Sequence, residues 1–416
     1  MEYRLKSDST KVSLLGYGAM RMPAIDGGHA NNFADDASKA GIDQEELNRQ
    51  IKYLLDSGVT YFDTSPAYCR GLSEKCLGEA LFKSGYDRKD YLIVTKLSNF
   101  SPSQFSLEKC QKMFYKSLEN LRTDYIDNYL LHSVGNGGLT TFKKRYIDNG
   151  ALEWCAKMRG ERKIRNLGFS FHGDRKVWEW CLENHDKYKW DFCMIQLNYI
   201  DWYKGEAKKL YDEATEKKIP VVVMEPLLGG RLARYNWALA HELAPLDPKA
   251  SLARWALRFC GSLDNVMCIL SGMTYMEHME ENVKTFSPLK KLSSEESAAV
   301  KRAAEKYGKI KTIPCNSCNY CMPCPYGLDI PQILTFKNLV AIEEAKRSES
   351  GEKSAGAGFS QWLLKTYDKM VPNKLRRADH CTGCARCNPH CPQYIDVAKE
   401  MDAIDKLIER AKNEVY

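Results

Sequence analysis

Eight cysteines gather in two short runs near the C-terminal end of the chain. They are Cys315, Cys318, Cys321 and Cys324 in the first run, and Cys381, Cys384, Cys387 and Cys391 in the second. Thiolates at two-residue spacing can surround one compact core of soft metal, and a Cys-Pro step supplies a more rigid fourth ligand. Because both runs end in Cys-Pro, the pattern predicts two [4Fe–4S] clusters.

The two runs are expected to share their ligands. In bacterial two-cluster ferredoxins, the fourth cysteine of each run ligates the other cluster. We therefore expect the first three cysteines of the first run to pair with Cys391, and the first three of the second run to pair with Cys324. The first run has two residues before its fourth cysteine, where the ferredoxin pattern has three.

Zinc and disulfide bonds are the alternative uses of these thiols. Structural zinc favours two separated CxxC pairs over four evenly spaced cysteines. Disulfides belong to secreted proteins, whereas the N-terminal MEYRLKSDST lacks an apolar signal segment. The other eight cysteines are scattered singly along the chain, so iron–sulfur ligation is the favoured interpretation.

Composition predicts a soluble, cytoplasmic protein with a sizeable core. The chain has 416 residues, of which 44% are hydrophobic, and a formal net charge of +7. No apolar stretch approaches the roughly 20 residues that span a bilayer, and no basic run resembles a nucleic-acid arm. The segment KLRRAD at 374–379 is either a solvated helix end or a local basic patch for an acidic electron carrier.

Short apolar runs alternate with helical patterns between residues 10 and 286. The runs lie at 12–16, 61–63, 92–97, 127–132, 166–171, 192–198, 220–224 and 265–271. Eight such alternations predict a (β/α)₈ barrel with parallel strands. A doubly wound sheet is the competing fold, but the first run ends in Gly16-Tyr17-Gly18 without the third glycine of a dinucleotide fingerprint.

Four residues that can move a proton follow three successive predicted strands. Asp63 ends the second strand and precedes Tyr68, Lys96 ends the third, and His132 ends the fourth. Chemistry in a barrel takes place at the C-terminal ends of its strands. An ammonium near Tyr68 would make the phenol a better proton donor. Asp63 would hold the ammonium, and His132 would hydrogen-bond a substrate carbonyl. Each residue alone has an ordinary structural explanation.

The predicted domain order is a barrel over 1–288, a linker helix over 289–311 and a ferredoxin-like domain over 312–416. Helical patterns are also expected between the two cysteine runs and at the C-terminal end. The stretch SESGEKSAGAGF is expected to be flexible, as a surface loop or a lid.

The segment YFDTSPAYCRGLSEKCLGEAL resembles the signature of the aldo/keto reductase family, and TKL and LLHS resemble its lysine and histidine segments. With the cysteine tail, the chain resembles the members of that family that carry two [4Fe–4S] clusters. The resemblance implies hydride transfer from NADP or NAD to an aldehyde or ketone, with Tyr68 as proton donor. It also implies that nucleotide contacts come from Gly18, Ala19, Met20, Arg21, Asp63, Ser170, Gln196, Met224, Pro226, Leu227, Gly229, Gly272, His278, Glu281 and Asn282.

Three positions depart from the family pattern at the nucleotide site. Phe171 stands where asparagine is frequent, Met224 where an aromatic is frequent, and His278 where an arginine often grips the 2′-phosphate. Loss of a guanidinium weakens bidentate phosphate recognition, so NADP, NAD and a flavin all stay open as cofactors.

Nicotinamide nucleotides and iron–sulfur clusters transfer different numbers of electrons in one step. Hydride transfer moves two electrons, an iron–sulfur cluster passes one, and a flavin converts between the modes. A nicotinamide-dependent carbonyl reductase is the first hypothesis. The second is an electron-transfer enzyme whose clusters serve a flavin at the barrel mouth or a partner such as a ferredoxin or flavoprotein. The third is a redox-sensing or binding protein with a degenerate barrel.

Overall fold

The computed structural model describes residues 1–5, 10–25, 41–234 and 236–415. It divides into two compact units. The first consists of Met1–Leu227 and Arg254–Ser297, and the second consists of Leu228–Ala253 and Ala298–Tyr416. The segment 228–253, which lies within the predicted barrel domain, therefore groups with the segment that carries the cysteine runs.

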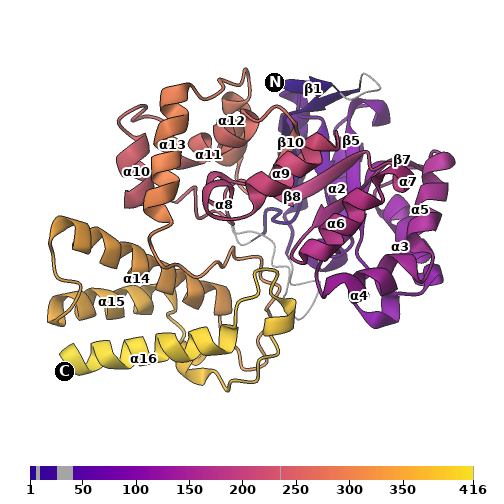
Figure 1. Cartoon of the computed structure of the whole chain (residues 1–416). Coiled ribbons are helices and arrows are strands. Elements are labelled where there is room, and N and C mark those ends of the chain that lie inside the picture. The colour runs from indigo at the N-terminus through magenta and orange to yellow at the C-terminus, as the bar shows by residue number, and fades with distance from the viewer. Residues whose placement is uncertain (6–9, 26–40, 235, 416) are drawn as a thin grey trace. The chain divides into compact units, whose positions relative to one another are not determined.

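Eight parallel strands close into a barrel in the first unit (Figure 1). They are β3 (Leu15–Gly18), β4 (Tyr61–Asp63), β5 (Leu92–Leu97), β6 (Ile126–Val134), β7 (Ile164–Phe171), β8 (Phe192–Gln196), β9 (Val221–Met224) and β10 (Val266–Ser271). The barrel closes where β10 pairs with β3, with Ile269 opposite Leu15. The predicted barrel is confirmed, and the doubly wound alternative is wrong.

The strands largely coincide with the predicted apolar runs because most of their residues are buried. Parallel strands that are covered on both faces need apolar side chains at successive positions. Side chains from several strands meet in one core cluster, among them Tyr61, Val94, Leu130, Met194 and Val222. This packing fills the barrel and directs chemistry to its rim.

The first predicted strand is in fact two elements. β2 (Lys11–Ser13) pairs antiparallel with β1 (Tyr3–Leu5), an element that the sequence did not predict, and β3 follows after Leu14. Because the short β1 is only partly buried, its sequence contains no apolar run that would predict a strand.

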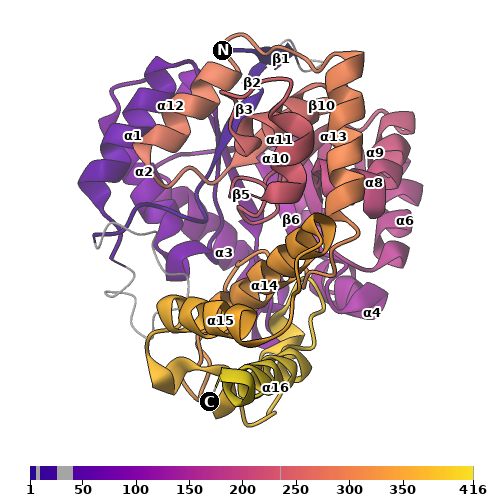
Figure 2. The ribbon, with the colours of Figure 1, turned by 90° about the vertical axis from the view of Figure 1, so that its left-hand side faces the viewer.

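Amphipathic helices surround the barrel as predicted. Figures 1 and 2 label several of them: α1 (Gln44–Asp56), α2 (Ser73–Lys83), α3 (Leu107–Asn120), α5 (Ala151–Gly160), α6 (Arg175–Glu183), α9 (Ala207–Glu216) and α12 (Met276–Thr285). Side-chain caps fix where two of them start. Asp43 accepts a hydrogen bond from the Glu46 N–H at 3.0 Å, and Ser106 accepts one from the Lys109 N–H at 3.3 Å.

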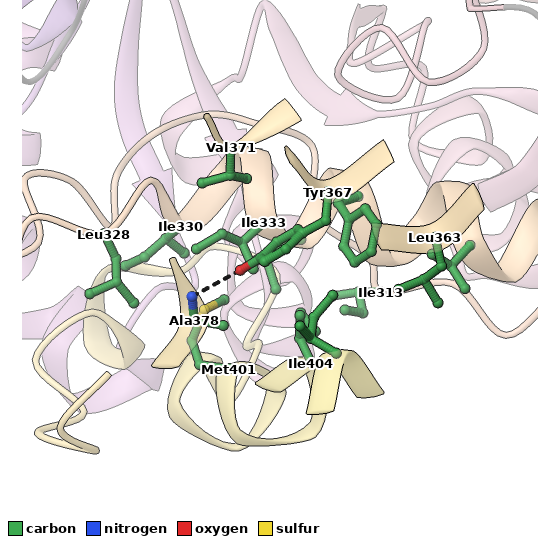
Figure 3. Packing of buried hydrophobic residues seen from close by; sticks show 14 of the residues in the cluster. Ile313, Leu328, Ile330, Ile333, Leu363, Tyr367, Val371, Ala378, Met401 and Ile404 are labelled. Atoms are coloured by element: carbon green, nitrogen blue, oxygen red, sulfur yellow. Dashed lines mark hydrogen bonds between the residues drawn. The ribbon is translucent and has the colours of Figure 1, made fainter. Parts of the chain in front are cut away.

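The second unit combines helices with irregular segments over its described residues. α14 (Ile330–Ser350), α15 (Ala357–Met370) and α16 (Val397–Val415) pack against one another (Figure 2). The stretch at 348–359 expected to be flexible includes the end of α14, the non-helical connection at 351–356 and the start of α15. Ile333, Phe336, Leu363 and Ile404 are nearly or fully buried in the core between these helices. Figure 3 shows part of that core, where the Tyr367 hydroxyl accepts a hydrogen bond from the Ala378 N–H at 3.0 Å.

The cysteine runs occupy the irregular segments that the helices of the second unit leave between them. The first run precedes α14, and the second lies between α15 and α16. Within the described ranges, no helix is long and apolar enough to cross a membrane.

Candidate active site

Three strand ends and one turn bring the four predicted proton-handling residues together. Asp63 is the last residue of β4, and Tyr68 opens the short turn η2 (Tyr68–Gly71) that follows. Lys96 lies near the end of β5, and His132 lies near the end of β6. Since β4, β5 and β6 are neighbours in the barrel, the four side chains meet at one edge of it.

Lys96 and Asp63 form a buried ion pair. The Lys96 Nζ lies 2.6 Å from the Asp63 Oδ1 and donates a second hydrogen bond of 2.7 Å to the Thr64 carbonyl. Burial raises the pKa of the Asp63 carboxyl and lowers the pKa of the Lys96 amine, and the attraction between the two charges opposes both shifts. The short distance and the low exposure hold the ammonium rigidly in place.

The phenol of Tyr68 lies beside this pair. Lys96 Nζ lies 4.8 Å from the centroid of the Tyr68 ring. The Tyr68 ring packs edge-on against His132 with 5.8 Å between centroids. A cation this close stabilises negative charge on the phenol oxygen, which is what a proton donor needs.

His132 is held by two serines on its Nδ1 side. The Ser98 Oγ lies 2.6 Å and the Ser65 Oγ lies 3.3 Å from Nδ1, and the two hydroxyls share a hydrogen bond of 2.8 Å. Burial lowers the pKa of His132 well below its ordinary range, and Lys96, His172 and Arg145 lower it further. The imidazole is therefore neutral at physiological pH.

A buried arginine fixes the backbone beneath the site. Arg145 donates to the carbonyls of His132 at 2.7 Å and of Asn99 at 3.1 Å. The Tyr146 hydroxyl donates to the same His132 carbonyl at 2.8 Å. These bonds tie the end of β6 to the segment after β5.

Several of these supporting residues carried no sequence signal. Ser98 and Arg145 belong to no recognised motif, and only the folded chain brings them to His132. Glu74 lies inside the quoted family signature and is buried, with its Oε1 accepting a hydrogen bond of 2.6 Å from Thr95. Burial raises the pKa of Glu74, while Thr95, Ser117, Asn120 and Lys96 oppose the shift.

The first group of predicted nucleotide residues lies next to Asp63. The Ala19 N–H donates to the Asp63 carbonyl at 2.8 Å, directly after Gly18. The Thr274 hydroxyl donates to the carbonyl of Arg21 at 3.1 Å, and Met20 lies between these residues. The Asp63 Oδ2 is buried with no hydrogen-bond partner among the described residues. An acceptor in that state fits a ribose hydroxyl of a bound nucleotide.

Ser170, Gln196 and Met224 lie at or near the ends of β7, β8 and β9. The Ser170 hydroxyl already accepts a hydrogen bond of 2.8 Å from the Ser133 N–H. The Gln196 amide nitrogen donates to Asp201 Oδ2 at 2.8 Å. Met224 packs against the barrel core. These three predicted nucleotide contacts therefore lie at the rim of the barrel, and Ser170 and Gln196 already use part of their hydrogen-bonding capacity within the protein.

The remaining predicted contacts follow β9 and β10. Pro226 and Leu227 lie in the turn after β9, while Gly229 belongs to the second unit. Gly272 follows β10, and Asn282 on α12 donates a hydrogen bond of 3.1 Å to the Ser271 hydroxyl.

His278 and Glu281 lie on α12. His278 is exposed and packs edge-on against Tyr275, with 5.1 Å between ring centroids. Glu281 is half-buried. An exposed imidazole is a weaker grip for a phosphate than a guanidinium fork.

Within the second unit, four thiols line one cavity. They are Cys315, Cys318, Cys321 and Cys391. Leu334 and Ile395 supply apolar walls of the same cavity. Burial raises the pKa of Cys321, and the nearby Cys318, Cys315 and Cys391 raise it further. This donor set is the one predicted for the first cluster, and its chemistry suits a soft metal core.

The other four thiols form a second group. Burial raises the pKa of Cys387, and Cys324, Cys384 and Cys381 add to that shift. Cys324 is therefore near the second triplet and not only near its own run. In the part of the chain that the structure covers, no three cysteine, histidine or acidic side chains converge on a position for a single metal ion.

Comparison with known proteins places the barrel in one family. The sequence model of the "Aldo/keto reductase family" matches residues 27–305 and ends before the first cysteine run. The chain is 26% identical to L-galactose dehydrogenase of Arabidopsis thaliana, over 70% of this chain and 90% of that protein. It is 27% identical to the methylglyoxal reductase YeaE of Escherichia coli, over 69% and 92% respectively.

Solved structures give the same fold. An aldo-keto reductase from Bacillus halodurans in its holo form superimposes with a TM-score of 0.56 at 23% identity, over 73% of this chain and 96% of that one. An aldo-keto reductase from Klebsiella pneumoniae in complex with NADPH gives a TM-score of 0.55 at 20% identity, over 73% and 95%. The chain therefore belongs to the aldo/keto reductase family and is an NAD(P)-dependent oxidoreductase.

Proposed function

We propose that this protein reduces a small aldehyde or ketone with NADP(H) or NAD(H), and that Tyr68 donates the proton. The supporting observation is the Tyr68 phenol placed beside the buried Lys96–Asp63 pair and a neutral imidazole. The nucleotide supplies the hydride when it is bound. Asp63 and the backbone around Gly18 would hold its ribose end, since Asp63 Oδ2 has unused acceptor capacity.

Lys96 and His132 would assist proton transfer in different ways. The ammonium of Lys96 favours negative charge on the phenol oxygen and so eases proton release to the substrate oxygen. The proposed function needs the tautomer in which the Ser98 hydroxyl donates to His132 Nδ1, 2.6 Å away, and the proton of the neutral ring is on Nε2. That N–H is then available to donate to the substrate carbonyl and to stabilise charge that develops on its oxygen.

NADP(H) is the first nucleotide to test. Two of the similar Klebsiella pneumoniae structures are described as complexes with NADPH or NADP. The exposed His278 stands in place of the expected arginine, which predicts a weaker preference for the 2′-phosphate than a guanidinium gives. Methylglyoxal and L-galactose, taken from the names of two relatives, represent the substrate classes of small dicarbonyls and sugars.

We further propose that the eight clustered cysteines hold two [4Fe–4S] clusters with crossed ligands. Support comes from the cavity lined by Cys391 with the first triplet and from the proximity of Cys324 to the second triplet. The clusters would be one-electron carriers. The grouping of all eight thiols favours a second candidate function, in which the clusters exchange electrons with a flavin or a partner redox protein.

The test combines metal analysis with turnover. Anaerobically purified protein is expected to contain about eight iron and eight sulfide per chain and to oxidise NADPH only when a carbonyl substrate is added. Zinc without iron would exclude the clusters, and an absence of carbonyl turnover with either nucleotide would exclude the reductase. Cluster bleaching by a reduced flavin in the absence of carbonyl turnover would favour the electron-transfer enzyme.

A further inference from the structure

His172 lies at the edge of the barrel where the four proton-handling residues meet. It follows β7 directly, and its N–H donates to the Val134 carbonyl at 2.8 Å, so its backbone continues the pairing of β7 with β6. The residue is half-buried. Within the ranges that the structure describes, its imidazole makes no hydrogen bond. The ring therefore has polar atoms that a small molecule at the barrel mouth can use.

The alternation of side chains along β7 places this imidazole on the inner side of the barrel. Phe169 and Phe171 both pack against Trp178 of α6, with 5.8 and 5.2 Å between ring centroids, so they face the surrounding helices. Successive side chains of a strand point to opposite faces, and His172 is one residue beyond Phe171. It therefore continues the inward-facing positions of β7, one step nearer the mouth than Ser170.

The electrostatics agree with an inward-facing ring. Burial lowers the pKa of His172 to about 4, and the charge of Lys96 adds to the shift. Burial and Lys96 also lower the pKa of His132, and His172 contributes further. The two imidazoles and the ammonium therefore lie within electrostatic reach of one another. At neutral pH the His172 ring is uncharged and offers one N–H donor and one nitrogen acceptor.

The backbone of His172 is fixed beside the end of β6. The register of β6 with β7 shifts between Leu131 and Val134, the stretch that contains His132. Such irregularities re-aim side chains and are frequent next to active sites. Just beyond, Gly135 has φ +97°, and a Cβ at that position would lie 2.2 Å from the His172 carbonyl oxygen. This close approach of the two chains gives His172 the rigid support that a binding residue needs.

Phe100 supplies an apolar surface at the same place. Its ring lies 5.0 Å from the ring of His132, between centroids, and the residue is 44% exposed. A substrate whose carbonyl oxygen is bound by His132 would therefore have the Phe100 ring beside its carbon atoms. The His172 imidazole would be available for a second polar group of the same substrate.

We infer that His172 binds an oxygen on the carbon next to the reacting carbonyl, so that the substrates are small 2-hydroxy or 2-oxo carbonyl compounds. This inference rests on the proposed function, because the carbonyl oxygen must lie at Tyr68 and His132. Adjacent strands are about 4.8 Å apart, a span that oxygens on two neighbouring carbons can bridge with one hydrogen bond to each imidazole. The second oxygen is unchanged in the reaction: a hydride from the nucleotide adds to the carbonyl carbon, and the proton of Tyr68 adds to the carbonyl oxygen.

Hydroxyacetone and 2-butanone test the inference, because they differ only by a hydroxyl in place of a methyl next to the ketone. The measurement is kcat/KM for each ketone with the whole protein and saturating nucleotide. The wild type is expected to prefer hydroxyacetone by about tenfold, which is what one hydrogen bond between uncharged groups can contribute.

Variants then assign the preference to His172. His172→Leu fills similar space without a polar atom, and it is expected to lower kcat/KM for hydroxyacetone by about tenfold while that for 2-butanone stays the same. His172→Gln keeps a donor and an acceptor and is expected to restore part of the preference. His241→Leu, at an exposed histidine on α10 (Trp237–Leu243), is the control and is expected to behave as the wild type.

The outcomes separate the inference from the function beneath it. An equal fall for both ketones in His172→Leu would mean that His172 only positions the catalytic groups. Equal turnover of both ketones by the wild type, or reduction of butanal without reduction of hydroxyacetone, would also contradict the inference, and in all three cases the proposed function stands. If the wild type reduces no carbonyl compound with either nucleotide, the proposed function and the inference both fail. Circular dichroism identifies any variant that does not fold, and the preference of the wild type decides the inference in that case.

Discussion

The Lys96 Nζ lies 2.6 Å from the Asp63 Oδ1, and the lysine and aspartate side chains are 1% and 3% exposed. Burial of two charged groups carries a desolvation cost that can exceed the attraction between them. Such a pair is retained where a fixed charge is useful, and here the ammonium faces the Tyr68 ring. The Lys96–Asp63 pair is therefore expected to affect both the stability of the barrel and proton donation by Tyr68.

Lys96→Met is expected to destabilise the barrel by about 3–5 kcal/mol, because it leaves a buried carboxylate without its partner. The double variant Asp63→Asn with Lys96→Met is expected to recover part of that loss, since no unpaired charge then remains. Urea unfolding followed by tryptophan fluorescence measures both. A single variant as stable as the wild type would contradict the buried pair.

His132 predicts how stability depends on pH. Its pKa in the folded chain lies well below the ordinary 6.5, so below pH 6.5 the unfolded chain binds a proton that the folded chain does not. The free energy of unfolding is therefore expected to fall as pH falls from about 6.5, by up to about 1.4 kcal/mol per pH unit. His132→Asn is expected to remove this part of the slope, and an unchanged slope in the variant would show that His132 is not buried neutral.

Ser98→Ala tests the orientation of the imidazole. Loss of the 2.6 Å contact to Nδ1 frees the ring to change tautomer. The expected result is a decrease in kcat on the order of tenfold, a small part of the roughly 10²–10⁴-fold that acid–base catalysis contributes. The Kd for NADPH is expected to stay the same. Ser103→Ala, at an exposed serine after β5, is the control, and equal activity of both variants would contradict the role of Ser98.

Pairs of cysteine variants test the crossed ligation. With crossed ligands, Cys381→Ala with Cys391→Ala removes one ligand from each cluster, and iron is expected to fall from about eight to nearly none. Cys315→Ala with Cys391→Ala removes two ligands from the same cluster, and about four iron atoms are expected to remain. The opposite pattern would mean that each run holds its own cluster.

The barrel could be predicted from the sequence because its strands are continuous apolar runs and its helices are amphipathic. The active-site residues could be predicted because Asp63, Lys96 and His132 each stand at a strand end, where the topology alone brings them together. Both signals are local in the sequence. Hydrophobic periodicity and the position of a residue at a strand end can be recognised without the folded structure.

Other features depend on contacts between distant segments. β1 is too short and too exposed to have an apolar signature. Arg145 and Ser98 reach His132 only after folding, and no motif marks either of them. The grouping of 228–253 with the cysteine segment depends on packing such as that between Gly229 and Asn316, which leaves no periodic trace in the sequence.

The most direct test of the proposed function is Tyr68→Phe, measured by carbonyl-dependent oxidation of NADPH together with NADPH binding. The variant keeps the ring beside Lys96 and removes only the hydroxyl that would donate the proton. Tyr115→Phe, at an exposed tyrosine on α3, is the matched control. We predict that Tyr68→Phe lowers kcat by at least about 100-fold, with the Kd for NADPH within about twofold of the wild type. Carbonyl reduction by Tyr68→Phe at the rate of the wild type and of Tyr115→Phe would contradict the assignment of Tyr68 as the proton donor.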